Sequence, residues 1–161
     1  MPIVLFRVDE RLIHGQVVVG WGGPLHADRV VVVDDELAAS AWEQELYCLG
    51  VPAEMEARFA SVEEARRLLP AWRTDGHRTV VLVRDVTTAA RVAEGGLLHG
   101  EELNVGGIHH APGRDRVLPY VFLNDGEREA LRTLASLGVA VSARDLPNSR
   151  RVPLEELLAE S

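Results

Sequence analysis

The sequence predicts a single α/β domain built on an open, mostly parallel, doubly wound sheet with helices on both faces. Short runs of β-branched and other apolar residues alternate with segments of helical length along the whole chain. The connections between successive strands are long enough for the crossover helices that parallel strands require. A length of 161 residues suits one hydrophobic core, so we expect one domain over residues 1–161.

The first predicted strand is IVLFRV at 3–8, and the second is RVVVVD at 29–34. Residues 15–25 lie between them and are long enough for a short helix. We therefore expect a βαβ unit with parallel strands and a right-handed connection. The remaining helices are expected at about 36–49, 61–69, 86–95, 126–137 and 153–159, and the remaining strands at about 54–59, 78–83, 102–105 and 139–144.

Local signals support several of these boundaries. Ser61 followed by Glu64 matches a capping box, and Asp85 precedes a helical segment that ends in a glycine pair. The segment VLPYVFL at 117–123 has an extended pattern but contains Pro119, which cannot donate a ladder hydrogen bond. We expect that segment at a sheet edge or in an irregular pairing.

Composition limits both the partners and the chemistry. The formal net charge of −8 argues against nucleic acid as the main partner, because duplex binding needs clustered positive charge. No apolar run approaches the ~20 residues that span a bilayer, so we expect a cytoplasmic protein without membrane insertion. All 17 basic residues are arginine, so any bound anion must be held by arginine or by backbone N–H groups.

Cysteine and tryptophan residues are expected to be structural. The single cysteine, Cys48, excludes an intrachain disulfide, and its apolar neighbours indicate a buried thiol. Trp21, Trp42 and Trp72 lie in or near helical segments, so we expect them to pack in the core or at its rim.

The stretch RVDERLIHGQV at 7–17 follows the first strand, at the sheet edge where open α/β folds bind ligands. If that strand ends near Val8 and a helix begins near Gly15, His14 lies at or just before the first helical turn. The free N–H groups of that turn disfavour an imidazolium and leave a ring nitrogen free to attack. They also form an anion site, so His14 is a candidate phosphoryl carrier.

The neighbours of this histidine supply the other parts of such a site. Arg11 has a guanidinium that can hold phosphate oxygens, and Asp9 can orient the imidazole or hold Arg11. Arg7 points either to the site or to the sheet face, and Gly15 and Gln16 belong to the same phosphate cradle. A solvated turn with a surface or capping histidine is the alternative that the residues alone leave open.

A second motif, LNVGGIHH, occupies 103–110. Gly106 and Gly107 are expected at the carboxyl end of a strand beside the histidine loop, where their missing side chains allow close backbone approach to a phosphate or a partner. Adjacent His109 and His110 point to opposite faces of an extended segment, so no metal site is expected.

The loop HHAPGRDR at 109–116 follows this motif. Arg114 and Arg116 either help to bind an anion or the donor domain, or belong to a solvated loop with turn residues Pro112 and Gly113. The sequence leaves both interpretations open.

RVDERLIHGQV resembles the signature around the phosphorylated histidine of the IIB subunit of the mannose/fructose/sorbose-type sugar phosphotransferase system (PTS). LNVGGIHH resembles that family's second glycine motif, and a looser similarity extends over nearly the whole chain. The resemblance implies that His14 accepts a phosphoryl group from a phosphorylated IIA domain, on the δ nitrogen, and passes it to sugar bound by the membrane components IIC and IID. It also implies that Arg11 is the arginine of the active loop.

In-line transfer with charge neutralisation by Arg11 and backbone N–H groups needs no metal or other cofactor. A regulatory module, in which phosphorylation of His14 changes a docking surface and no sugar moves, is the alternative function. A hydrolase with His14 as general base lacks a nucleophile in the motif. The sequence determines neither the sugar nor the oligomeric state, so a homo-oligomer stays open.

Overall fold

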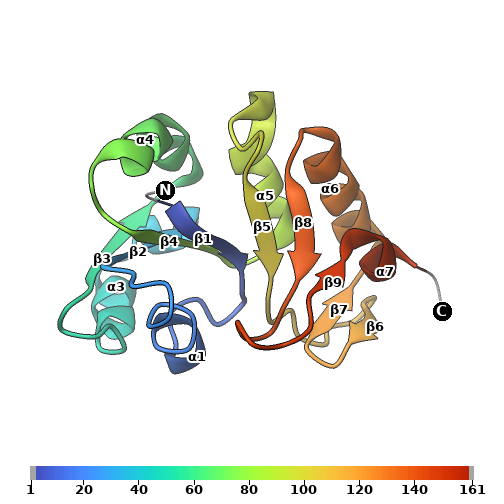
Figure 1. Ribbon diagram of the computed structural model, residues 1–161, viewed down its shortest axis with the longest axis horizontal. Coiled ribbons are helices and arrows are strands. Elements are labelled where there is room, and N and C mark those ends of the chain that lie inside the picture. Colours follow the sequence, from blue (N-terminus) through green and yellow to red (C-terminus); the bar gives the residue numbers. More distant parts are fainter. Residues whose placement is uncertain (1–2, 160–161) are drawn as a thin grey trace.

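A computed structural model describes residues 3–159. Within them, seven strands form one sheet in the order β3-β2-β4-β1-β5-β8-β9 (Figure 1). Every neighbouring pair is parallel except β8 and β9, which are antiparallel. The strands of this sheet are β1 (Ile3–Val8), β2 (Arg29–Val33), β3 (Glu56–Ala60), β4 (Thr79–Val83), β5 (Glu102–Val105), β8 (Ala140–Ala143) and β9 (Val152–Pro153). The predicted fold class is confirmed.

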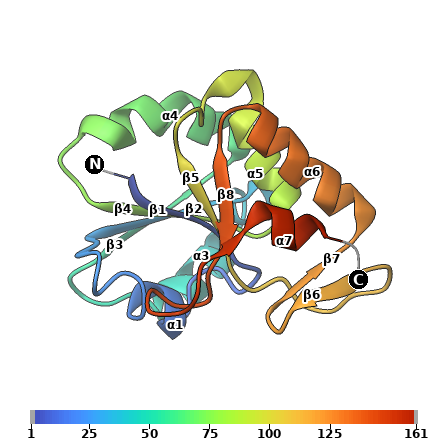
Figure 2. The ribbon, with the colours of Figure 1, turned by 45° about the vertical axis from the view of Figure 1, so that its right-hand side comes forward.

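Two further strands, β6 (Asp115–Leu118) and β7 (Val121–Leu123), form a separate antiparallel hairpin beside α7 (Figures 1 and 2). The helices are α1 (Gly15–Val18), α2 (Asp35–Ala38), α3 (Ala41–Cys48), α4 (Val62–Thr74), α5 (Val86–Ala93), α6 (Asp125–Ser136) and α7 (Leu154–Leu158), with a short 3₁₀ turn η1 (Glu94–Gly96). None of the helices in the described part of the chain is long and apolar enough to cross a membrane.

Hydrophobic cores lie on both faces of the sheet, because successive side chains of a strand point to opposite faces. In β2, Val31 and Val33 join the core under α4, α5 and α6, whereas Val30 and Val32 join the core under α1, α2 and α3. The second core extends over β2, β4 and β1. In Figure 1, α5 and α6 lie behind β5 and β8.

The two faces of β5 and β8 differ in polarity. Leu103 and Val141 pack into the core formed with α5 and α6. On the other face Glu102, Asn104 and Ser142 line a pocket. The prediction of helices on both faces therefore holds for the first four strands of the sheet, while β5 and β8 turn a polar face outward.

The helix expected at 15–25 is one regular turn followed by irregular turns. Beyond α1 the chain uses wider hydrogen bonds, from Gly20 N to Gly15 O at 3.2 Å and from Gly22 N to Val17 O at 2.9 Å. A Cβ atom at Gly20 or Gly22 would overlap a carbonyl of the preceding turn. The glycines permit this irregular winding and the close approach of these carbonyls, which the spacing of apolar residues did not reveal.

Helix α4 runs to Thr74, although its predicted end was at 69, before Pro70. Proline inside a helix removes one hydrogen bond and costs roughly 3 kcal/mol. Leu69 and Trp72 are buried on either side of Pro70 in sequence. Burial of the Trp72 ring on the far side of the proline offsets that cost and keeps the last turn helical.

The helix expected at 36–49 is divided into α2 and α3, and its outer face is apolar. Trp42 is 68% exposed and Leu46 is 59% exposed, and Cys48 is exposed as well. The predictions that Trp42 packs in the core or at its rim and that Cys48 is buried were therefore wrong. Helix α3 packs through Tyr47, which turns these three side chains outward.

We predict that Trp72→Ala lowers the free energy of unfolding by about 3–5 kcal/mol, because it leaves a cavity in the core under α4. Trp42→Ala is the matched control and should change that free energy by less than about 0.5 kcal/mol. Urea denaturation followed by circular dichroism measures both. Equal losses for the two variants would contradict the burial difference.

Candidate functional site

The loop from Asp9 to His14 connects β1 to α1 at the carboxyl end of the sheet. Its first residues pair with the segment after β5, since Gly106 N donates to Val8 O at 2.7 Å and Glu10 N donates to Gly107 O at 2.9 Å. The expectation that the glycine pair lies beside the histidine loop is confirmed. In the strand order the chain leaves β1 and β5 in opposite directions, so the loop lies at a switch point.

His14 is the N-cap residue of α1, with an extended backbone and a side chain that is 14% exposed. Its Nε2 atom is buried 3.2 Å from Oδ1 of Asp9, without the alignment of a hydrogen bond. The Asp9 carboxylate thus faces one ring nitrogen. Nδ1 is the nitrogen on the other side of the ring.

Asp9 is fully buried, and its two oxygens have different partners. Oδ1 also accepts from Arg11 N at 3.1 Å, and Oδ2 lies 3.2 Å from Nη2 of Arg7. Burial raises the pKa of Asp9, but the His14 contact and the charge of Arg7 outweigh burial, so the pKa lies below its usual value. The carboxylate is therefore ionised at neutral pH.

A neutral imidazole was expected because His14 lies beside the free N–H groups and the positive dipole end of a helix that begins near Gly15. Helix α1 has only four residues, and a single turn carries a small dipole. The charged group that faces the ring is the Asp9 carboxylate. The helix begins where it was expected, and Asp9 faces the ring, while a single turn adds only a small dipole field at His14.

Arg7 is fully buried beneath Asp9. Its Nη1 donates to Asn104 Oδ1 and, at 2.8 Å, to the carbonyl oxygen of Arg144, and its Nη2 donates to the carbonyl oxygen of Asp145 at 3.2 Å. Burial lowers the pKa of Arg7, and the neighbouring Asp9 carboxylate opposes that shift. The phosphate-binding role expected for Arg7 does not fit this environment, because its guanidinium is turned to protein acceptors.

Gly106 makes room for this buried guanidinium. A Cβ atom at Gly106 would overlap the guanidinium of Arg7, whereas one at Gly107 would lie 3.6 Å from Asp9 Oδ1 and from His109 Nε2. The predicted close approach at Gly106 is therefore real, but the approaching group is Arg7 and not a phosphate. At Gly107 the backbone carbonyl anchors the histidine loop.

Arg11 is exposed and is held by Gln16. Its Nη2 donates to Gln16 Oε1 at 3.2 Å, and Gln16 Nε2 donates to Asp145 Oδ1 at 2.7 Å. The side chain of Gln16 therefore links Arg11 to the end of β8. Asp145 was missed in the sequence, although its place after a predicted strand at the carboxyl edge was the available signal.

A second ion network fixes the loop after β5. Arg114 donates to Glu10 Oε1 at 2.8 Å and to Glu127 Oε2 at 2.7 Å, and Glu10 Oε1 also accepts from His109 N at 2.6 Å. Arg114 is thus not free for an anion, and Glu10 does not belong to a solvated turn. The sequence carried no signal for this network, because the burial of Glu127, which makes it need a partner, is a property of the fold.

Of the remaining loop residues, His110 packs edge-on against Phe122, with 5.7 Å between ring centroids. Arg116 lies exposed on β6. Neither His110 nor Arg116 adds a group to the histidine loop.

Comparison with known proteins finds the family model of the PTS system sorbose subfamily IIB component over residues 3–161. The N-acetylgalactosamine-specific phosphotransferase enzyme IIB component 1 of Escherichia coli (strain K12) is 31% identical over 92% of this chain and 94% of its own length. The mannose-specific EIIAB component of the same strain is 29% identical over 99% of this chain, which spans only 49% of that protein. The crystal structure of the IIBSor domain of the sorbose permease from Klebsiella pneumoniae superposes with a TM-score of 0.87 at 26% identity, covering 98% of this chain and 96% of that one.

We predict that Gly106→Ala lowers the free energy of unfolding by about 1–3 kcal/mol, because the added methyl group displaces the Arg7 guanidinium from its acceptors. Gly107→Ala is the matched control, with ordinary contact distances, and should cost less than about 1 kcal/mol. Chemical denaturation of both variants tests this difference. A larger loss for Gly107→Ala would show that Gly106 does not make room for Arg7.

Asp9→Asn should lower the free energy of unfolding by about 3–5 kcal/mol at pH 7, because it leaves the buried charge of Arg7 unpaired. The lowered pKa of Asp9 stabilises the fold above the ordinary aspartate pKa of 3.8, and this contribution is lost as the pH falls through the folded-state value. The difference between wild type and Asp9→Asn should therefore shrink below about pH 4.

Asp115→Asn is the control, since that carboxylate is 78% exposed 3.6 Å from Arg128. Its cost should stay below about 1 kcal/mol. A pH-independent difference for Asp9→Asn would contradict an ionised, stabilising Asp9.

Proposed function

The chain belongs to the sorbose subfamily of PTS IIB components, and from this premise we propose that His14 is the residue that carries the phosphoryl group. A IIB component is a phosphocarrier of PTS sugar transport and has phosphotransferase activity. One observation supports the assignment to His14. The imidazole lies at the β1–α1 corner with Nε2 against the buried Asp9 carboxylate, which leaves Nδ1 as the nitrogen for the incoming phosphorus.

In the proposed mechanism Nδ1 of His14 attacks the phosphorus in line with the breaking bond to the donor histidine. The lone pair of Nδ1 forms the new P–N bond, and the donor nitrogen keeps the electrons of the old one. The Asp9 carboxylate lies 3.2 Å from Nε2 and balances the positive charge of the substituted ring. In the second transfer a sugar hydroxyl oxygen forms the new P–O bond, Nδ1 keeps the electrons of the broken P–N bond, and the hydroxyl proton is released.

Arg11 and the backbone N–H groups of Gly15 and Gln16 are proposed to bind the phosphoryl oxygens. The Arg11 guanidinium is exposed beside the loop, and Gln16 restrains it. We assign Arg7 a positioning role through Asp9, in place of the direct phosphate contact expected from the sequence. Catalysis in this proposal comes from positioning and charge neutralisation, with no metal or other cofactor.

PTS IIB components work with IIA and with IIC and IID partners. For this chain we propose a phosphorylated IIA domain as donor and membrane-bound IIC and IID components as the site of sugar phosphorylation, together with the expected cytoplasmic location. The name of the mannose-specific EIIAB relative, which combines A and B, supports the IIA donor. The relatives are named for different sugars, so we assign none, and no observation favours the regulatory alternative.

The phosphoryl site is tested by incubating the protein with a IIA domain that phosphoenolpyruvate and the general PTS proteins keep phosphorylated. Intact mass spectrometry should show one added phosphoryl group on wild type and on the control His110→Ala, and none on His14→Ala. Nitrogen NMR of the product should place the phosphorus on Nδ1. Continued phosphorylation of His14→Ala would remove the site assignment.

Arg11→Gln should slow phosphoryl transfer from IIA by about 100-fold, because it removes a charged donor that neutralises the transferring group. Arg116→Gln removes another exposed arginine, on β6, and should leave the rate unchanged. Rapid-quench measurement of His14 phosphorylation compares the two. An unchanged rate for Arg11→Gln would exclude its proposed role.

A further inference from the structure

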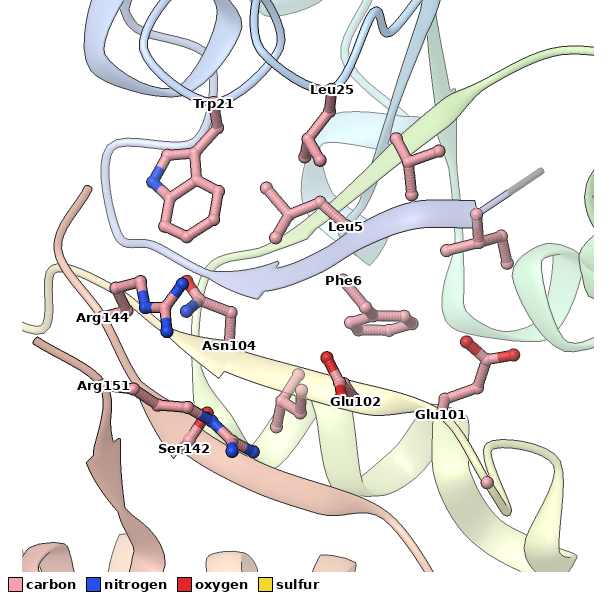
Figure 3. Close-up of a pocket in the computed structure, with 14 residues that line it drawn as sticks. Leu5, Phe6, Trp21, Leu25, Glu101, Glu102, Asn104, Ser142, Arg144 and Arg151 are labelled. Carbon is pink, nitrogen blue, oxygen red and sulfur yellow. The ribbon is translucent and has the colours of Figure 1, made fainter. Parts of the chain in front are cut away.

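A pocket of about 590 Å³ opens beside the apolar residues of β1 and the polar face of β5 and β8 (Figure 3). It is separate from the histidine loop and falls within the range of roughly 300–1,000 Å³ that is typical of small-molecule sites. Figure 3 shows Leu5, Trp21 and Leu25 on one side of the pocket, with Arg144 and Arg151 across from them. The pocket therefore has an apolar wall and a cationic wall, with the carboxylates of Glu101 and Glu102 at the end away from the arginines.

The cationic wall is built from two arginines without a carboxylate partner among residues 3–159. Arg151 Nε donates to Ser142 Oγ at 3.1 Å, which orients the guanidinium. Arg144 donates through Nη1 to Pro147 O at 3.3 Å, while its Nε is buried without a hydrogen-bond partner. Two oriented guanidinium groups of this kind favour an anion, and phosphate matches their geometry.

The floor of the pocket supplies groups that bind hydroxyls. Asn104 uses its Oδ1 atom to accept from Arg7, and its amide nitrogen makes no hydrogen bond within the described part of the chain. Glu102, two residues earlier on β5, is exposed and offers carboxylate oxygens as acceptors. The neighbouring Leu5 and Trp21 side chains suit the C–H face of a sugar ring.

We infer that this pocket binds a sugar phosphate, with the phosphate on Arg144 and Arg151 and the sugar ring between Asn104 and the apolar wall. The transported product carries the same two chemical features. The binding inference stands on the pocket alone.

The inferred effect on His14 rests on the proposed function. Asn104 and the carbonyl of Arg144 both accept from Arg7, and Arg7 pairs with Asp9 beneath His14. A phosphate in the pocket and a phosphoryl group on His14 place two negative charges around this one buried cation. Each therefore weakens the other, and the product of transport disfavours reloading of His14.

The binding test is isothermal titration calorimetry on the unphosphorylated full chain with glucose 6-phosphate, glucose and inorganic phosphate as probes. Glucose 6-phosphate should bind saturably and more tightly than inorganic phosphate or glucose. Arg151→Gln should raise its Kd by about tenfold, because it removes a charge-assisted contact. Arg150→Gln is the matched control, since Arg150 pairs with Glu156 at 3.2 Å outside the pocket, and it should leave the Kd unchanged.

Several results would overturn the inference. No saturable binding of glucose 6-phosphate at millimolar concentration would exclude the sugar phosphate site. Inorganic phosphate binding as tightly as glucose 6-phosphate would leave an anion site without a sugar subsite. An unchanged Kd for Arg151→Gln would place the ligand elsewhere.

Variants of the histidine loop separate this pocket from the phosphoryl site. His14→Ala and Arg11→Gln should retain the affinity for glucose 6-phosphate, and the indole N–H resonance of Trp21 should shift on binding in both. Loss of affinity in these variants, with none in Arg151→Gln, would mean that the sugar phosphate binds at the histidine loop and would refute the pocket. If His14 is not the phosphorylated residue, these binding results are unaffected.

The coupling is tested by the extent of His14 phosphorylation at equilibrium with phosphorylated IIA. Saturating glucose 6-phosphate should lower the equilibrium constant for that transfer by about fivefold, and Arg151→Gln should remove this effect at the same ligand concentration. An equilibrium constant that does not change with ligand, measured where calorimetry shows the pocket to be full, would refute the coupling and leave the binding site in place.

Discussion

The buried ion pair between Arg7 and Asp9 is the constraint on which the rest of the site depends. Both side chains are fully buried, and removing two charges from water costs several kcal/mol unless further hydrogen bonds satisfy them. Arg7 finds these acceptors at the ends of β5 and β8, while Asp9 contacts the loop that carries His14. The pair therefore joins the scaffold to the reacting ring, and a rigid support of this kind is what transfer by positioning requires.

The same constraint explains why the two glycines differ. Gly106 lies against the guanidinium of Arg7, so any side chain at position 106 would overlap that group. Gly107 instead accepts the Glu10 N–H, and Glu10 in turn caps the backbone of His109 through its carboxylate. Through Arg114 and Glu127, this contact extends to α6. Two ion networks thus hold the histidine loop: Arg7 binds its Asp9, and Arg114 binds its Glu10.

The uneven covering of the sheet creates the second functional surface. Residues of β5 and β8 that face α5 and α6 are apolar, whereas Glu102, Asn104 and Ser142 on the other face carry carboxylate, amide and hydroxyl groups, and Arg144 and Arg151 add guanidinium groups from the segments next to β8 and β9. Because Asn104 lies on this polar face and also accepts from Arg7, the pocket and the histidine loop share one buried cation. A negative charge bound in the pocket therefore changes the electrostatic potential at the histidine loop, and a negative charge at the loop changes the potential in the pocket.

Local patterns determined the order of strands and helices and the position of His14 at the carboxyl end of β1, because apolar periodicity and helix caps act over a few residues. They failed where packing against residues far away in the sequence decided the outcome, as for Pro70 beside buried Trp72 and for the outward-facing Trp42. Only the tertiary structure decided that Arg7 supports Asp9 and that Arg114 binds Glu10. Arg7 is held in that role by Asn104, 97 residues away along the chain, and Arg114 lies 104 residues from Glu10. Which groups meet at such separations depends on how strands pair and helices pack, which no short sequence pattern encodes.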